Sequence, residues 1–121
     1  MKSHWVEQKG TRVFITDFSR MGSDWEGLQE EAAAVIETLK SEQPNSVRAI
    51  TNVEHTIANE NTMRVLRETL PHTNPYVRVR AVVGVHGFRK HLVAAFTRLT
   101  GRAQFIIFET MEEALDWIVN Q

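Results

Sequence analysis

The chain has 121 residues, of which 42% are hydrophobic and 24% are charged, with a formal net charge of −1. This length predicts a single domain over residues 1–121 with its own core. The near-neutral charge argues against nucleic acid as a partner, and the absence of cysteine excludes disulfides and thiol chemistry. No apolar run reaches the length of a membrane span and no segment resembles a signal peptide, so we expect a cytoplasmic protein.

The chain opens with the pattern of a β-hairpin. Residues 4–7 and 12–17 are short strands, and Gly10 between them supplies the positive φ of a tight turn. Ser23 and Glu26 have capping-box spacing and predict the start of a helix, which ends at residues 43–45. The inner face of this helix is predicted to carry Trp25, Leu28, Ala32, Val35, Ile36 and Leu39, with Glu30, Glu31 and Lys40 on the other side.

Residues 47–52 form the next predicted strand, and a second helix follows it. Asn59, Asn61 or Thr62 caps this helix, which runs to about residue 70, where Pro71 and the pair Asn74-Pro75 close it. Its predicted inner positions are Met63, Leu66 and Leu70.

The second half of the chain repeats this alternation. Residues 76–83 alternate apolar with basic residues and then become apolar throughout, which indicates a strand half exposed at its start and buried further on. A helix is predicted after Gly87 with Gly101 as its C-terminal residue, then a strand at 104–108. Thr110 and Glu113 predict the cap of a last helix, with Met111, Ala114, Leu115 and Ile118 on its inner face.

The predicted fold class is therefore α/β, with the element order β-β-α-β-α-β-α-β-α. It is a mixed, mostly parallel sheet of about five strands flanked by four helices, with an antiparallel first strand.

Several segments are similar to those of a known family. They are residues 14–19, 74–77, 81–85 with Gly87, 108–110 and 113–118. Over nearly its whole length the chain resembles the small bacterial STAS/SEC14-like proteins, also described as SpoIIAA-like. The resemblance implies a mixed sheet flanked by helices and a regulatory or binding role without turnover. SEC14 lipid-transfer domains are about twice this size, so a deep lipid cavity is not implied.

One family feature is missing. Anti-sigma antagonists of the STAS class carry a phosphorylatable serine in an Asp-Ser dipeptide after the third strand. Residues 52–59 lack this dipeptide, and Thr56 is the hydroxyl residue among them. The phospho-switch is therefore not transferred to this chain.

Parallel strands bring their carboxyl ends to one edge of a sheet, where α/β folds place binding sites. We expect a polar cluster there, made of Asp17, Ser19, Asn52 and Thr110. If Asp17 lies beside His86, the pair is suited to general acid–base catalysis. The alternative interpretation of these polar residues is that Asp17 and Asn52 cap loops. The stretch around the fourth strand end predicts an anion site at a helix start, formed by Gly84, His86, Gly87, Arg89 and Lys90. Its alternative is that the glycines serve close packing.

No metal or cofactor is assigned, because the five histidines lack ligand spacing. No residue is assigned a catalytic role either. Trp25 and Trp117 are core aromatics or anchors of a homodimer. A local basic region is also predicted, including Arg78 and Arg80.

The sequence thus favours a non-enzymatic regulatory module that binds a protein or a small anionic or apolar ligand. The alternatives are a small enzyme that uses Asp17 and His86, or a homodimeric structural protein.

Overall fold

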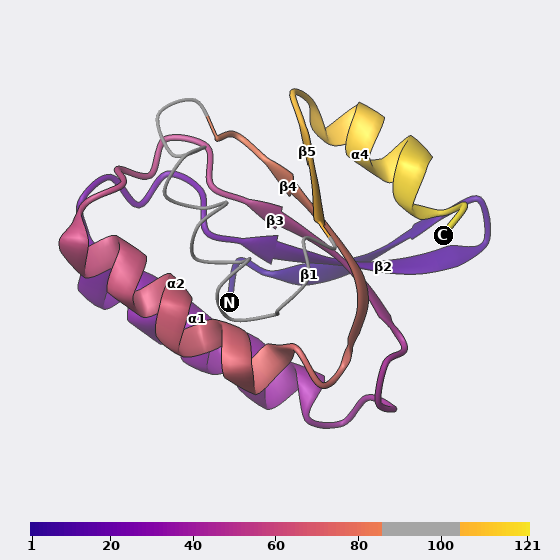
Figure 1. The fold of residues 1–121 in the computed structure, drawn as a ribbon, viewed down its shortest axis with the longest axis horizontal. Helices are drawn as coiled ribbons and strands as arrows, with labels where there is room; N and C mark the ends of the chain where they lie inside the picture. The colour runs from indigo at the N-terminus through magenta and orange to yellow at the C-terminus, as the bar shows by residue number, and fades with distance from the viewer. Residues whose placement is uncertain (86–104) are drawn as a thin grey trace.

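The computed structural model describes residues 1–85 and 105–121, and these form an α/β fold around a five-stranded mixed sheet (Figure 1). The strands lie in chain order across the sheet. β1 is antiparallel to β2 and the other neighbours are parallel, in agreement with the predicted mixed, mostly parallel sheet. The strands are β1 (His4–Gln8), β2 (Thr11–Asp17), β3 (Val47–Asn52), β4 (Val77–Val83) and β5 (Phe105–Phe108). The described helices are α1 (Trp25–Leu39), α2 (Glu60–Thr73) and α4 (Met111–Ile118).

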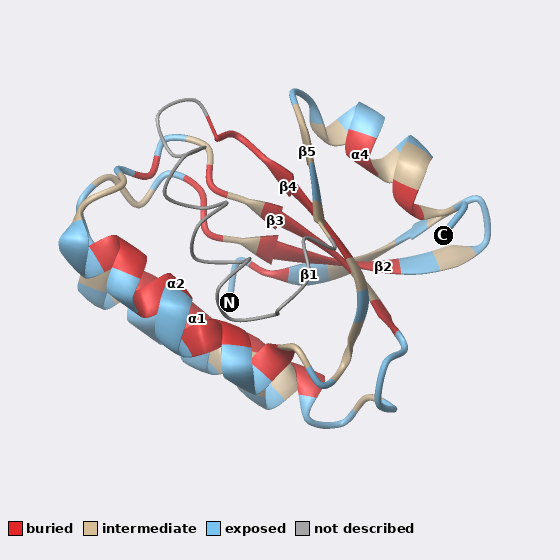
Figure 2. Cartoon of the chain, in the orientation of Figure 1, coloured by how far each residue is buried: buried red, intermediate tan, exposed pale blue. Residues whose placement is uncertain are grey.

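The helices cover both faces of the sheet. α1 and α2 pack side by side on one face and α4 lies on the other (Figure 1). Successive strand residues point to opposite faces. Accordingly Phe14 and Val82 belong to the core under α1 and α2, whereas Ile15 and Ile50 belong to the core under α4. Figure 2 shows the central strands buried, which accounts for their apolar sequences.

The β1–β2 hairpin forms where the sequence predicts it. Its two turn residues, Lys9 and Gly10, have φ values of +50° and +78°. Positive φ at both central residues is the geometry of a type I′ turn, whose twist matches that of the flanking strands. The predicted role of Gly10 is confirmed.

The start of α1 differs from the prediction by one residue. Asp24, not Ser23, is the N-cap, and its Oδ1 accepts a hydrogen bond from the Gly27 backbone N–H at 3.0 Å. Both residue types are good caps, so spacing alone did not distinguish them.

Glu31 was expected on the solvent side of α1, and that prediction is wrong. The residue is buried. Its carboxylate accepts hydrogen bonds from the backbone N–H groups of Lys2 at 3.0 Å and Ser3 at 2.8 Å. The N-terminal segment crosses this side of the helix and covers the carboxylate. Glu30 and Lys40 are exposed, as predicted.

α2 is capped at Asn59, one of the three predicted positions. Asn59 Oδ1 accepts from the Thr62 backbone N–H at 2.9 Å, and Thr62 Oγ1 accepts from the Asn59 backbone N–H at 3.0 Å. The helix does not end before Pro71 but continues to Thr73. Pro71 has no backbone N–H to donate within the helix, and its side chain is exposed. The last turn is nevertheless closed, because the Asn74 N–H donates to the Leu70 carbonyl at 2.9 Å.

β4 becomes buried along its length, as the sequence predicts, with Ala81 to Val83 enclosed. Arg80 departs from the expected basic surface because it is only 7% exposed. Helices cover both faces of the sheet at this point, so alternation along β4 does not direct Arg80 to solvent.

The end of the chain also follows the prediction. Thr110 caps α4 by accepting from the Glu113 backbone N–H at 3.1 Å, and Ala114 and Ile118 are buried. The helix predicted after Gly87 lies outside the described residues.

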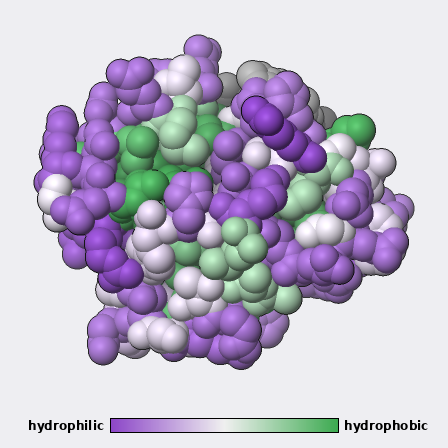
Figure 3. All heavy atoms as spheres, turned by 180° about the vertical axis from the view of Figure 1, so that it is seen from behind, coloured by the Kyte–Doolittle hydropathy of each residue, from purple (hydrophilic) through white to green (hydrophobic). Residues whose placement is uncertain are grey.

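The tryptophans contribute to packing. Trp25 packs partly buried against the α1/α2 core, and the Trp117 ring lies 5.5 Å from that of Phe108. Of the described large hydrophobic residues, Met1, Ile57 and Ile106 are exposed. The face opposite to that of Figure 1 is mainly hydrophilic, with hydrophobic atoms gathered left of centre in that view (Figure 3).

Candidate functional site

Polar side chains meet where β2 and β3 end. Asp17 is the last residue of β2 and pairs in register with Asn52, the last residue of β3. Ser19 follows in the loop after β2. These three residues belong to the predicted carboxyl-edge cluster, and they line one hollow of about 400 Å³. We call this the carboxyl-edge hollow, and its described lining is Lys2, Asp17, Ser19, Arg20, Asn52, Glu54 and His55.

Asp17 organises the first loop of the carboxyl-edge hollow. Its Oδ1 accepts hydrogen bonds from the Ser19 backbone N–H at 3.0 Å and from the Ser19 hydroxyl at 2.5 Å. The same oxygen lies 3.7 Å from the ammonium of Lys2, which also donates to the Ser19 carbonyl. Partial exposure makes this ion pair weak in energy. The role of Asp17 is therefore to orient the loop after β2. Asn52 orients the loop after β3 in the same way, because its Oδ1 accepts a hydrogen bond from the Glu54 backbone N–H at 3.0 Å.

Lys2 reaches this edge because the N-terminal segment is fixed to α1. The carboxylate of Glu31 accepts hydrogen bonds from the backbone N–H groups of Lys2 and Ser3, as described above. Burial on its own raises the pKa of Glu31, but these hydrogen bonds outweigh it and hold the pKa below its ordinary value of 4.5. The Ser3 hydroxyl in turn accepts from the Asp17 N–H at 2.9 Å. The segment before β1 is thus bonded to both α1 and β2.

The loops after β2 and β3 are joined by main-chain hydrogen bonds beyond the ends of the strands. The N–H groups of Phe18, Arg20 and Gly22 donate to the carbonyls of Asn52, Glu54 and His55 at 2.9, 2.7 and 3.0 Å. The Ile57 N–H returns to the Gly22 carbonyl at 2.8 Å. The two loops therefore form one rigid wall.

Arg20 and His55 protrude from this wall with unusual backbone conformations. Their φ values are +59° and +57°, in the left-handed region that residues with a β-carbon rarely adopt. Both residues are exposed and line the carboxyl-edge hollow. The hydrogen bonds between the loops hold both backbone conformations and so fix the points from which these two side chains extend.

Thr56 is a structural residue of the same wall. It is 6% exposed, its hydroxyl donates to the Phe18 carbonyl at 2.5 Å, and it accepts from the Met21 N–H at 3.2 Å. A hydroxyl enclosed in this way is not presented to a kinase. The structure therefore gives Thr56 a loop-joining function.

Gly84 belongs to the predicted anion site, and in the structure it packs against the backbone of Glu54. Its φ is +86°, and a β-carbon built on it would lie 2.6 Å from the Glu54 nitrogen and 2.8 Å from the Glu54 Cα. This contact favours the packing role for that glycine. His86, Gly87, Arg89 and Lys90 lie outside the described residues, and so does the His86 partner of the acid–base hypothesis.

Thr110 does not join the other three predicted edge residues. It caps α4 and is absent from the described lining of the carboxyl-edge hollow. Sequence reasoning in turn missed Lys2, Arg20, Glu54 and His55. Lys2 had a usable signal, because the predicted hairpin brings the start of β1 beside the end of β2. The other three reach the hollow through loop conformations that leave no periodic pattern.

Within the described residues, no cluster of three or more His, Asp or Glu side chains has the arrangement of a metal site. Over the same residues, no helix combines the length and apolar character needed to cross a membrane. Comparisons with protein-family models, with curated proteins and with solved structures found no match to this chain.

Proposed function

We propose that the protein is a non-enzymatic binding module of the STAS-like regulatory kind, and that it recognises a small polar ligand with an anionic group. The observation that carries this proposal is the wall of the carboxyl-edge hollow, in which main-chain hydrogen bonds between two loops fix the backbone positions from which Arg20 and His55 extend. A fixed backbone limits how much of the loops a ligand must order on binding, which favours recognition of a small molecule.

The composition of the carboxyl-edge hollow supports a polar ligand. Its described lining contains the nitrogen groups of Lys2, Arg20 and His55 beside the carboxylates of Asp17 and Glu54. The guanidinium of Arg20 presents its N–H groups in a planar fork that matches a carboxylate or phosphate in two-point contact. The Lys2 ammonium already faces Asp17, so Arg20 is the cation that we assign to the anionic group of the ligand.

The contacts of Asp17 favour binding over catalysis. A general base needs a lone pair directed at the substrate proton. Asp17 Oδ1 accepts two hydrogen bonds from Ser19 and faces Lys2. This oxygen of the carboxylate therefore supports the loop, in agreement with the interpretation of Asp17 as a loop cap.

Binding of simple anions tests the proposal. Inorganic phosphate and citrate are titrated calorimetrically into the wild type, into Arg20→Gln and into the control Arg67→Gln, which removes an exposed arginine of α2. We expect Arg20→Gln to weaken binding about tenfold, the effect of losing one charge-assisted contact. The control is expected to bind like the wild type. Equal affinity of all three proteins for both anions would refute the proposal.

A further inference from the structure

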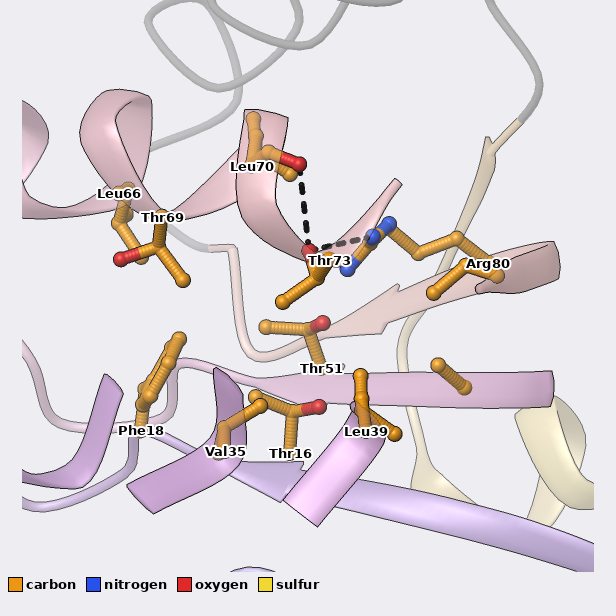
Figure 4. Close-up of a pocket in the computed structure, with 12 residues that line it drawn as sticks. Thr16, Phe18, Val35, Leu39, Thr51, Leu66, Thr69, Leu70, Thr73 and Arg80 are labelled. Carbon is orange, nitrogen blue, oxygen red and sulfur yellow. Dashed lines mark hydrogen bonds between the residues drawn. The ribbon is translucent and has the colours of Figure 1, made fainter. Parts of the chain in front are cut away.

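A small cavity with a mainly apolar lining lies between the sheet and the helices α1 and α2. It is a narrow cavity of about 20 Å³, enough for one particle the size of a water molecule. Figure 4 shows the side chains that line this internal cavity, which come from β2, β3 and β4 of the sheet and from the helices α1 and α2. The polar residues of its lining are Thr16, Thr51, Thr69, Thr73 and Arg80.

Thr51 is the residue that indicates an occupant. It is 2% exposed, and its Oγ1 is the buried side-chain polar atom in the described part of the chain that has no hydrogen-bond partner. The hydroxyls of Thr69 and Thr73, by contrast, donate to α2 carbonyls at 2.7 and 3.3 Å. Buried hydroxyls are normally hydrogen-bonded, so a polar species inside the cavity would satisfy Thr51.

The sheet register places Thr51 close to Arg80. Thr51 pairs with Thr16 on β2, while Arg80 on β4 pairs with Ala49, two residues before Thr51 on the same face of β3. Thr51 and Arg80 are therefore diagonal neighbours on adjacent strands. Figure 4 shows the Thr51 hydroxyl and the Arg80 guanidinium facing the same space.

The charge of the internal cavity is positive. Among the described residues that line the cavity, Arg80 carries a charge and none is Asp or Glu. Residues 86–104 contain no Asp or Glu in the sequence either. Arg80 Nη2 donates to the neutral oxygens Thr73 Oγ1 and Asn74 Oδ1, each at 3.3 Å. Burial lowers the pKa of Arg80 to about 10, so the guanidinium stays charged at neutral pH.

We propose that this internal cavity binds one small monoanion of the size of chloride, held by the Arg80 guanidinium and by a hydrogen bond from the Thr51 hydroxyl. The volume excludes a carboxylate with an attached chain, and the sign of the charge excludes a metal cation. An anion here would accept the hydrogen bond of the Thr51 hydroxyl, whose oxygen has no partner among the described residues. The site is separate from the carboxyl-edge hollow, so it stands whether or not the proposed function holds.

Thermal unfolding tests this site. The midpoint of the wild type is measured at constant ionic strength while sodium chloride replaces sodium gluconate, whose anion is too large for the cavity. We expect the midpoint to rise by about 5 °C once chloride exceeds its dissociation constant tenfold. A midpoint that does not respond to chloride would overturn the proposal.

Two variants and one matched control locate the effect. Thr51→Val keeps the side-chain shape, removes the hydrogen-bond donor and is expected to weaken the apparent chloride affinity at least fivefold. Arg80→Met is expected to abolish the response. Arg78→Met removes the exposed arginine of the same strand and should respond like the wild type. An unchanged chloride response in Thr51→Val would contradict the proposal, and this variant stays informative if Arg80→Met fails to fold.

Crystals grown in sodium bromide give a direct answer. An anomalous bromide peak between Thr51 and Arg80 is the expected result. Density for water in the cavity with no anomalous signal would show a hydration site and overturn the anion assignment.

Discussion

Gly84 lies directly against the backbone of Glu54, so close that a β-carbon on Gly84 would come within 2.6 Å of the Glu54 nitrogen. This contact joins the end of β4 to the loop after β3, the same loop that carries His55 to the carboxyl-edge hollow. Packing at Gly84 therefore supports the wall on which the proposed binding function depends.

Replacing Gly84 by Ala should destabilise the fold. The substitution adds a left-handed strain and forces the Glu54 backbone to move, with an expected cost of about 3 kcal/mol. Gly10→Ala is the matched control, because Gly10 also has positive φ but nothing lies within 4 Å of the point that its β-carbon would occupy. Its expected cost is about 1 kcal/mol. Urea unfolding measures both, and equal losses would show that the Glu54 contact has no energetic importance.

Thr56 should be needed for the association of the two loops. Thr56→Val keeps the shape of the side chain but removes its hydrogen bonds to the Phe18 carbonyl and the Met21 N–H. We expect a loss of about 2 kcal/mol in the free energy of unfolding. Thr56→Ser retains the hydroxyl and is expected to recover most of this loss. The interpretation is wrong if the serine and valine variants unfold at the same denaturant concentration.

Glu31 should make stability depend on pH in the acid range. Its pKa in the folded protein is lowered from 4.5, so its contribution is present above that value and is lost as the pH falls through the folded pKa. The wild type is therefore expected to be more stable than Glu31→Gln at pH 7, with the difference shrinking toward pH 3. Chemical unfolding at several pH values measures this difference. A difference that stays constant from pH 7 to pH 3 would exclude the carboxylate as its source.

The sequence predicted the elements of this fold well where local patterns determine them. The hairpin with positive φ at Gly10, the parallel pairing of the later strands and the cap at Thr110 follow from turn chemistry, alternation and capping. The helix expected after Gly87 falls outside the described residues.

The errors arose where contacts between distant segments decide the outcome. Glu31 has the helical position of a solvent-facing residue, but the N-terminal segment covers it. Arg80 follows an alternating pattern that suggested exposure, but it is buried and its guanidinium contacts Thr73 and Asn74 at the end of α2. Neither covering segment can be deduced from a local sequence window.

In the carboxyl-edge hollow, too, the residues placed by regular strands were predicted and the residues placed by contacts between loops were missed. Asp17 and Asn52 were placed together because parallel strands align their carboxyl ends. Arg20 and His55 were missed because their left-handed backbones depend on hydrogen bonds between two loops about 35 residues apart in the sequence. Loop pairing of this kind has no periodic signature.

A titration of the ¹⁵N-labelled protein with inorganic phosphate, followed by two-dimensional NMR of the backbone amides, measures directly whether the carboxyl-edge hollow binds an anion. We expect saturable shifts concentrated in residues 17–22 and 52–57, the two loops that build the carboxyl-edge hollow. These shifts should be lost in Arg20→Gln and kept in Arg67→Gln. Saturable shifts confined to other parts of the chain, or an identical response in the Arg20 variant, would contradict the proposed binding function.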